Sequence, residues 1–259
     1  MITLKEVLSI PSYSGEETMV IDYIINFCDT NGFNYYSDIK KNIYITKGLV
    51  SEGEYYPCVI AHMDTVHSDQ LSLIRDKQNI NIDESIRNGK TMLTGHHPIY
   101  NKITGIGGDN KCGIFIALNL LLTTTTIKVA FFVEEEIGMK GSSVCDESFF
   151  KDVGYAMQFD APTNNWFSKT CTGIKLWTDE MFEDVKPILE KYGIDNISTD
   201  PFTDVVQMRK KFDFCCMVLC SGYYQQHTKY EYVIKEDVIN SIKMGGEIIE
   251  KLGRKKYVI

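Results

Sequence analysis

The chain contains four stretches in which apolar residues recur every three or four positions, which is the spacing of one face of a helix. This spacing predicts helices over residues 14–31, from Asp109 through Leu120, over 178–192 and over 235–253. Asn31-Gly32 is a typical helix stop, so we expect the first of these helices to end there.

Short, continuous apolar runs lie between the predicted helices, and such runs are typical of strands buried on both faces of a sheet. The strongest are Tyr55–Ala61, Thr126–Val133, Tyr155–Phe159 and Phe212–Leu219, with weaker runs at Phe33–Tyr36 and Asn42–Thr46. Residues 77–95 instead alternate around Asn88-Gly89, a dipeptide that favours a tight turn, and they predict a β-hairpin.

The alternation of strands with helices favours an α/β fold. We predict a three-layer α/β/α sandwich with a mostly parallel, mixed central sheet. The 259 residues contain no internal repeat and no linker-like segment, so a single domain over residues 1–259 is expected. The segment from Asp160 to Phe212 is the only candidate for an insertion, and we interpret its helix as part of the core.

Composition narrows the class of protein. Hydrophobic residues make up 44% of the chain and charged residues 24%, which is ordinary for a soluble domain. The net charge of −8 argues against a nucleic-acid partner, and no apolar run is long enough to predict a membrane span. Eight scattered cysteines, without zinc-finger spacing or an export signal, favour reduced thiols and a cytoplasmic location.

Histidines and carboxylates follow several of the apolar runs. They occur in five segments, Ala61–Val66, Gly107–Gly113, Glu134–Gly138, Phe159–Pro162 and Gln226–Thr228. Parallel strands bring their carboxyl ends to one edge of a sheet, where ligands bind, so we expect these segments to meet there. Imidazole nitrogens and carboxylate oxygens together suit two zinc ions that keep open positions for water.

Each segment also has a simpler interpretation when it is taken alone. Asp109 precedes a helical run and is a good N-cap, whereas Glu134–Glu136 has the composition of a solvated acidic loop. His227 has only polar and aromatic neighbours, which is ordinary for a loop histidine. We interpret the remaining histidines, His67, His96 and His97, as surface loop residues, with His96-His97 a candidate contributor to a substrate pocket.

Over most of its length the chain resembles the di-zinc exopeptidases, which include peptidase T, the carboxypeptidase G and acetylornithine deacetylase group, and the lid-less zinc aminopeptidases. The resemblance runs through Leu8–Glu17, His62-Met63-Asp64, Gly108–Lys111, Glu135–Gly138, Asp160, Gly222–Thr228 and Glu231–Val233. These motifs occur in the order of the family and at compatible spacing.

The resemblance implies a role for each matching residue. His62 and Asp160 would each bind one ion, Asp109 would bridge the two ions, and Glu136 and His227 would complete the shell of the second ion. Glu135 would be the general base, and Asp64 would orient His62. The adjacent glutamates leave a one-residue shift conceivable, and the Glu-Glu-Ile-Gly context favours this choice. Tyr223 or Tyr224 would help to hold the tetrahedral oxyanion of the substrate.

These roles predict metal-assisted hydrolysis. The short segment after Asp160 leaves no room for an inserted lid domain, which favours an aminopeptidase that acts on short peptides. A deacylase of N-acylated amino acids is one alternative, and a catalytically silent binding module with the same fold is an alternative of another class. Mixed nitrogen and oxygen ligands favour zinc, while cobalt or manganese, the preferred side chains and the oligomeric state stay open.

Overall fold

A sheet of eight strands, in the order β1-β2-β7-β3-β8-β13-β9-β12, forms the centre of the computed structural model, which describes residues 2–198 and 201–259. The strands are β1 (Asn34–Ser37), β2 (Ile43–Lys47), β7 (Ile127–Phe132), β3 (Tyr56–His62), β8 (Val153–Ala161), β13 (Cys215–Cys220), β9 (Trp166–Ser168) and β12 (Asn196–Ser198). The neighbours β7, β3, β8 and β13 run parallel to one another, so their carboxyl ends share one edge of the sheet.

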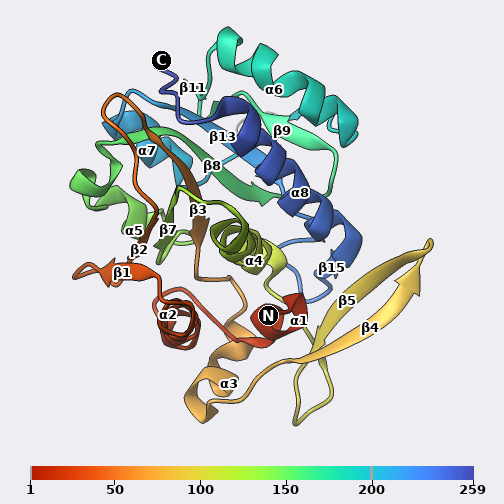
Figure 1. Cartoon of the computed structure of the whole chain (residues 1–259). Coiled ribbons are helices and arrows are strands. Elements are labelled where there is room, and N and C mark those ends of the chain that lie inside the picture. The colour runs from red at the N-terminus through yellow and green to blue at the C-terminus, as the bar shows by residue number, and fades with distance from the viewer. Residues whose placement is uncertain (1, 199–200) are drawn as a thin grey trace.

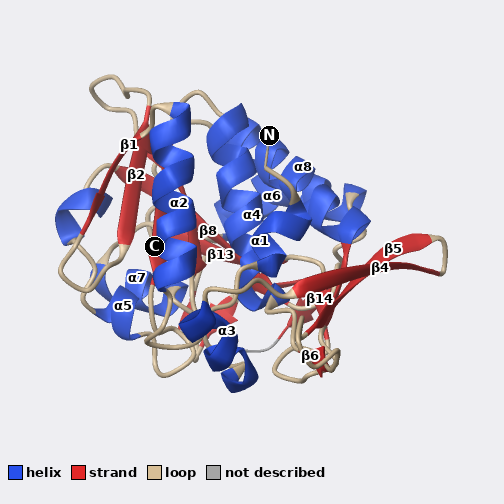
Figure 2. Cartoon of the chain, turned by 90° about the horizontal axis from the view of Figure 1, so that it is seen from below, coloured by secondary structure: helices blue, strands red, loops and turns tan. Residues whose placement is uncertain are grey.

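Helices cover both faces of this sheet (Figures 1 and 2). The helices are α1 (Leu4–Ser9), α2 (Thr18–Asn31), α3 (Leu71–Asp76), α4 (Gly108–Thr123), α5 (Lys140–Ser143), α6 (Asp179–Lys191), α7 (Val205–Lys211) and α8 (Lys235–Leu252), with 3-10 turns η1 (Ser68–Gln70) and η2 (Glu147–Phe150). Helices α4, α8 and α6 pack together on one face, and α5 and α7 lie on the other.

Side-chain alternation along β8 shows how the two faces are used. The ring of Phe159 lies against Gly245 of α8, where an added Cβ atom would come within 2.8 Å of it. The preceding residue, Gln158, points to the opposite face and accepts a hydrogen bond from the backbone N–H of Val205 in α7. Because both faces are covered, every residue of β3, β7 and β13 is buried, as the continuous apolar runs predicted.

A smaller sheet projects from this body. It contains β14 (Tyr223–Tyr224), β15 (Tyr232–Ile234), β5 (Lys90–His96) and β4 (Asn81–Arg87), and β6 (Ile103–Thr104) pairs with β5. The β4–β5 hairpin extends away from the helices, and its turn residues Asn88 and Gly89 are both left-handed, as this turn type requires (Figure 1). A further two-stranded ribbon pairs β10 (Thr170–Cys171) with β11 (Ile174–Lys175).

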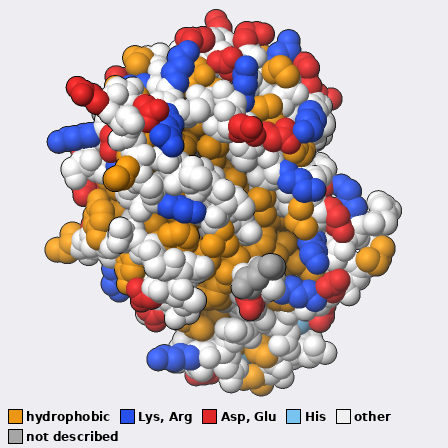
Figure 3. Space-filling view, in the orientation of Figure 1, with side chains coloured by type: hydrophobic (Ala, Val, Ile, Leu, Met, Phe, Trp, Pro, Cys, Tyr) orange, Lys and Arg blue, Asp and Glu red, His pale blue; other side chains and the backbone are white. Residues whose placement is uncertain are grey.

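The α/β sandwich expected from the sequence is therefore confirmed, and the described residues form no separate lid domain. That the whole chain is a single domain stays a prediction. Among the described helices, none is both long and apolar enough to span a bilayer. On the face shown in Figure 3, acidic and basic side chains are interspersed around a central apolar area rather than gathered by sign.

Candidate metal centre

Three parallel strands bring histidine and carboxylate side chains to one edge of the central sheet. His62 is the last residue of β3, and Asp160 is the last but one of β8. Glu135 and Glu136 follow β7, which lies beside β3. The convergence follows from parallel pairing, because neighbouring parallel strands end on the same side.

Asp109 and His227 reach the same place from outside the sheet. Asp109 lies at the beginning of α4, after Gly107, which adopts a left-handed conformation with φ 68°. His227 lies in the loop between β14 and β15 and is itself left-handed, with φ 61°. We refer to the six residues together as the histidine–carboxylate cluster: His62, Asp109, Glu135, Glu136, Asp160 and His227.

The Asp109 carboxylate lies between the two histidines. Its Oδ1 atom is 3.2 Å from Nε2 of His62, and its Oδ2 atom is 3.3 Å from Nε2 of His227. Each oxygen of one carboxylate therefore faces a different imidazole. That arrangement is the one expected of a carboxylate that bridges two cations.

Two overlapping groups of potential ligands share Asp109. In one, the Nε2 atom of His62 is 3.3 Å from Oδ1 of Asp160. In the other, the Nε2 atom of His227 is 3.2 Å from Oε1 of Glu136. Tetrahedral zinc with bonds of about 2.0–2.1 Å places its ligand atoms roughly 3.3–3.4 Å apart, so both spacings suit it. His62, Glu135 and Glu136 form a third close group.

Several polar atoms of this region are buried without a hydrogen-bond partner among the described residues. They include Oε1 of Glu135 and Oδ1 of Asn110, the residue that follows Asp109. Buried carboxylate oxygens without a partner are energetically costly. A divalent cation would satisfy them, so the residues present fit a metal centre.

The pKa values of the carboxyl groups reflect the same crowding. Burial raises the pKa of Glu135 to about 10, against the opposing effect of His62. Burial also raises the pKa of Asp160 to about 7, again against His62. A cation at the cluster would lower both pKa values, because it stabilises the ionised carboxylates.

The pKa values of the two histidines are also raised. Hydrogen bonds to Asp109 and Glu136 raise the pKa of His227 to about 10. Burial alone would lower the pKa of His62, but the nearby carboxylates of Asp160 and Glu135 raise it well above its usual value. The raised pKa values favour the protonated form of both imidazoles in the metal-free protein, so a bound metal would have to displace protons.

Asp64 holds two parts of the cluster in place. Its Oδ1 atom is 3.3 Å from Nδ1 of His62, the ring nitrogen that faces away from Asp109. The same carboxylate accepts hydrogen bonds from the backbone N–H groups of Glu135, at 2.9 Å, and Glu136, at 3.1 Å. The hydroxyl of Ser14 donates a further bond of 2.7 Å. Asp64 thus contacts both the imidazole and the glutamate loop, and its role in orienting His62 stays a prediction.

A buried pair that the sequence did not reveal supports the Asp109 turn. The Glu231 carboxylate accepts hydrogen bonds from the backbone N–H of Gly107, at 2.7 Å, and of Asp109, at 2.9 Å. Its Oε2 atom is also 2.8 Å from Nε2 of His67. The interpretation of His67 as a surface residue is wrong, since only 6% of it is exposed and its ring packs tightly over Gly105.

A second group of supporting residues that the sequence did not reveal lies next to Asp160. The hydroxyl of Thr203 and the side-chain amide of Gln158 both donate to Oδ2 of Asp160. Gln158 also donates to the buried carboxylate of Asp204, at 3.1 Å. Burial raises the pKa of Asp204 to about 6. These residues orient Asp160, and Thr203 and Asp204 lie too far from it in sequence to form a recognisable motif.

Three other candidates lie away from the cluster. His96 pairs with Asp83 within the β4–β5 hairpin, and His97 is buried rather than on the surface, with 7% exposure. Neither lines the described wall of the cavity at the cluster. The hydroxyl of Tyr224 donates to Asp237, at 2.7 Å, so Tyr224 is occupied elsewhere, whereas Tyr223 lines the cavity.

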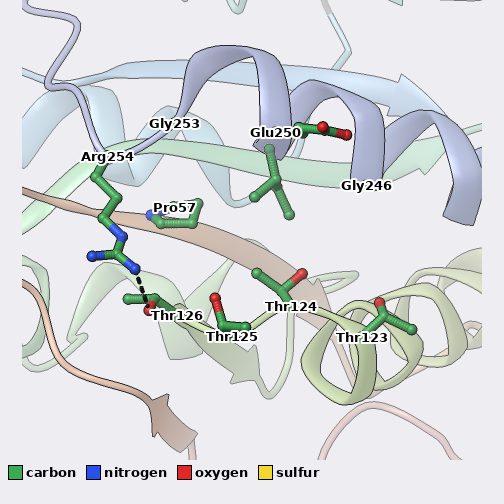
Figure 4. Close-up of a pocket in the computed structure, with 10 residues that line it drawn as sticks. Pro57, Thr123, Thr124, Thr125, Thr126, Gly246, Glu250, Gly253 and Arg254 are labelled. Carbon is green, nitrogen blue, oxygen red and sulfur yellow. Dashed lines mark hydrogen bonds between the residues drawn. The ribbon is translucent and has the colours of Figure 1, made fainter.

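The cavity at the cluster has a volume of about 280 Å³. Its described lining consists of Asp109, Glu135, Glu136, Asp160, Pro162, Trp166, Pro201, Phe202, Tyr223, Gln226 and His227. A larger cavity of about 470 Å³ lies near Pro57, at the opposite end of β3 from His62 (Figure 4). It is lined mainly by Thr123–Thr126 and the end of α8 and contains no residue of the cluster, so the chemistry belongs to the smaller cavity.

Comparisons with known proteins identify the fold. No family model matches the chain, and no curated protein matches its sequence. Among solved structures, the aminopeptidase PepT from Bacillus cereus is similar, with a TM-score of 0.73, 15% identity and coverage of 96% of each chain. A tripeptidase from Staphylococcus aureus has a TM-score of 0.70 at 13% identity and also covers 96% of each chain.

The TET1 peptidase from Pyrococcus horikoshii has a TM-score of 0.66 at 18% identity, and the match covers 94% of this chain and 97% of that one. The chain therefore has the fold of these peptidases along nearly its whole length. The resemblance seen in the sequence to the zinc exopeptidases is confirmed at the level of the fold.

Proposed function

We propose that the chain is a metal-dependent peptidase, and specifically an aminopeptidase that uses two zinc ions to cleave short peptides. The observation that carries this proposal is the position of Asp109, whose two oxygens face His62 and His227 at 3.2 and 3.3 Å. A carboxylate shared by two ligand groups at this spacing is suited to hydrolysis with a pair of ions. The similarity of the fold to aminopeptidases and a tripeptidase supports the same reading.

In this proposal His62 and Asp160 would hold one ion, Glu136 and His227 would hold the other, and Asp109 would serve both. When bound, the ions would lower the pKa of a shared water molecule and polarise the scissile carbonyl group. Asp64 keeps the His62 ring oriented through Nδ1, which favours binding of metal at Nε2.

Glu135 is the general base. It lines the cavity next to Glu136, and one of its oxygens is 3.9 Å from Nε2 of His62 while the other has no partner among the described residues. Burial raises the pKa of this carboxyl group to about 10 in the metal-free protein, and bound cations would lower it, so that the ionised group could take a proton from water and deliver it to the leaving amine. The hydroxyl of Tyr223 stays protonated, since burial raises its pKa well above the usual value, and it would hydrogen bond the substrate oxyanion.

The charge of the cavity favours an aminopeptidase over a deacylase. Four carboxyl groups line it, from Asp109, Glu135, Glu136 and Asp160, and none of its described lining residues is Lys or Arg. A deacylase of amino acids would need a cationic side chain for the substrate carboxylate, and the described lining residues provide none. The buried Lys111 does not supply one, because its Nζ atom donates to the backbone oxygens of Leu8 and Ile10.

The test is hydrolysis of one short peptide in two forms, free and N-acetylated, with and without a chelator. We expect cleavage of the free form only, and we expect the chelator to abolish it. Cleavage confined to the acetylated form, with release of acetate, would instead assign a deacylase. Absence of cleavage in both forms, with two ions bound per chain, would contradict the proposal and favour a silent binding module.

A further inference from the structure

We propose that the cavity selects peptides whose N-terminal residue has an apolar side chain, and that Trp166 and Phe202 form the surface that contacts this side chain. This inference rests on the proposed aminopeptidase function. It concerns the part of the cavity wall that the hydrolytic chemistry does not use.

The cavity has two chemically different walls. One consists of the histidine–carboxylate cluster, where the scissile carbonyl group and the free amine would lie. The other consists of Pro162, Trp166, Pro201 and Phe202, which carry no charge. In an N-terminal residue the amine and the side chain leave the same carbon atom, next to the scissile carbonyl. A substrate that places its free amine and its scissile carbonyl group at the cluster must therefore direct its side chain toward a neighbouring wall.

Trp166 and Phe202 come from different parts of the chain, and both line the cavity. Trp166 is the first residue of β9, and its Cα atom pairs with Asn196 of β12, which leads toward the segment that contains Phe202. Trp166 is half-buried, whereas 60% of Phe202 is exposed. Phe202 stacks on no ring within residues 2–198 and 201–259.

Phe202 offers exposed aromatic surface at the cavity, and an apolar group that covered it would remove that surface from water. An aliphatic or aromatic substrate side chain would cover Phe202 and remove part of the exposed indole of Trp166 from water. A glycine at the N-terminus of a peptide offers no such surface. The structure therefore points to a preference for residues such as leucine or phenylalanine.

Charge and size restrict the substrate further. An acidic side chain directed at the apolar wall would find no Lys or Arg among the described lining residues. A basic side chain directed at the apolar wall would find no carboxylate there. The volume of about 280 Å³ lies near the lower end for ligand cavities, so it accommodates only the first residue or two of a peptide.

The first experiment measures kcat/KM for tripeptides X-Ala-Ala with the zinc-loaded protein, where X is Gly, Leu, Phe, Asp or Lys. We expect Leu and Phe to exceed Gly by about tenfold to a hundredfold, the range that an apolar subsite provides, and Asp to be the poorest. Equal values for Gly and Leu, or a preference for Lys or Asp, would overturn the inference while leaving the aminopeptidase proposal intact. Absence of cleavage for all five would overturn the proposed function and this inference with it.

The second experiment assigns the preference to the two side chains. Trp166→Ala and Phe202→Ala should each lower the ratio of kcat/KM for Leu over Gly, chiefly through KM, and the double variant should reduce it to within about threefold. Tyr100→Ala is the matched control, because 65% of Tyr100 is exposed and it does not line the cavity. An unchanged ratio in the double variant would contradict the assignment of this wall.

A binding measurement separates recognition from turnover. In the Glu135→Gln background, calorimetry should show tighter binding of Leu-Ala-Ala than of Gly-Ala-Ala, and Phe202→Ala should remove most of that difference. The bound zinc content of each variant is measured in parallel, because the apolar wall should not affect it. Loss of zinc in Phe202→Ala would show that this residue supports the cluster itself, and that result would overturn its role as a substrate contact.

Discussion

Glu231 provides the strongest test of how the structure holds the bridging carboxylate. Its buried side chain accepts bonds from the backbone N–H groups of Gly107 and Asp109 and pairs with His67 at 2.8 Å. Glu231→Ala would leave these three donors buried without a partner. Each orphaned donor costs at least about 1 kcal/mol, so we expect the free energy of unfolding to fall by at least about 3 kcal/mol.

That loss is a large share of the roughly 5–15 kcal/mol by which most domains are stable. For a chain of this size it corresponds to a decrease in the unfolding temperature of about 6–12 °C. Glu231→Gln should cost less, because the amide keeps one oxygen acceptor while its NH₂ group faces a donor. Both variants loosen the turn that carries Asp109, so zinc affinity should fall by about tenfold to a hundredfold.

The assay is thermal unfolding in the presence of a chelator, followed by titration of the metal-free protein with zinc. The chelator separates the stability of the Glu231 contacts from the stabilisation that bound metal adds. Glu250→Ala is the control, because Glu250 is exposed on α8 and far from the cluster in sequence. If Glu231→Ala unfolds at the wild-type temperature and binds zinc with wild-type affinity, the positioning role of Glu231 is refuted.

Three further predictions concern the cluster itself. Glu135→Gln should keep two bound zinc ions and lower kcat by a factor of a hundred or more, measured by peptide hydrolysis and metal analysis; retained turnover would mean that another residue is the base. Asp160→Ala should reduce zinc from two ions per chain to one, and unchanged stoichiometry would remove Asp160 from the site. Zinc binding at pH 7 should release protons, because the pKa of His227 is raised to about 10 and that of His62 is raised well above its usual value in the metal-free protein. Zinc affinity should therefore rise with pH between about 6 and 8, and calorimetry in buffers of different ionisation enthalpy measures the release; a pH-independent affinity would contradict these protonation states.

The central sheet was predictable because its strands are buried on both faces and therefore appear as continuous apolar runs. Tyr55–Ala61 and Thr126–Val133 correspond to β3 and β7 within a residue or two at each end. The strands β9, β12, β14 and β15 were not predicted, since two or three residues are too few to establish a period. The outer strands that complete the sheet and the cavity were thus invisible to pattern analysis.

The buried pair of His67 and Glu231 shows a second limit. The two residues are separated by 164 positions, and neither lies in an apolar pattern that would signal burial. His67 follows Asp64-Thr65-Val66 and has the local features of a loop histidine. A buried histidine or carboxylate is stable only with a partner, and the identity of a distant partner depends on the tertiary structure. The local sequence therefore predicted the candidate ligands of a metal but not the distant residues that position these ligands.

The three adjacent glutamates illustrate how the backbone decides between two interpretations that the sequence left open. Glu134 has φ 53°, so the chain turns sharply directly after β7. Its largely buried side chain pairs with Lys40 and Lys140 and does not line the cavity. The turn directs the next two amides toward Asp64 and the next two side chains into the cavity. If the register were shifted by one residue, Glu134 would be buried beside Glu135, and Glu136 would pair with the two lysines instead. Glu136 would then no longer lie near His227, whose Nε2 atom is 3.2 Å from its Oε1 atom. The geometry thus favours Glu135 and Glu136 as the pair that acts in the cavity.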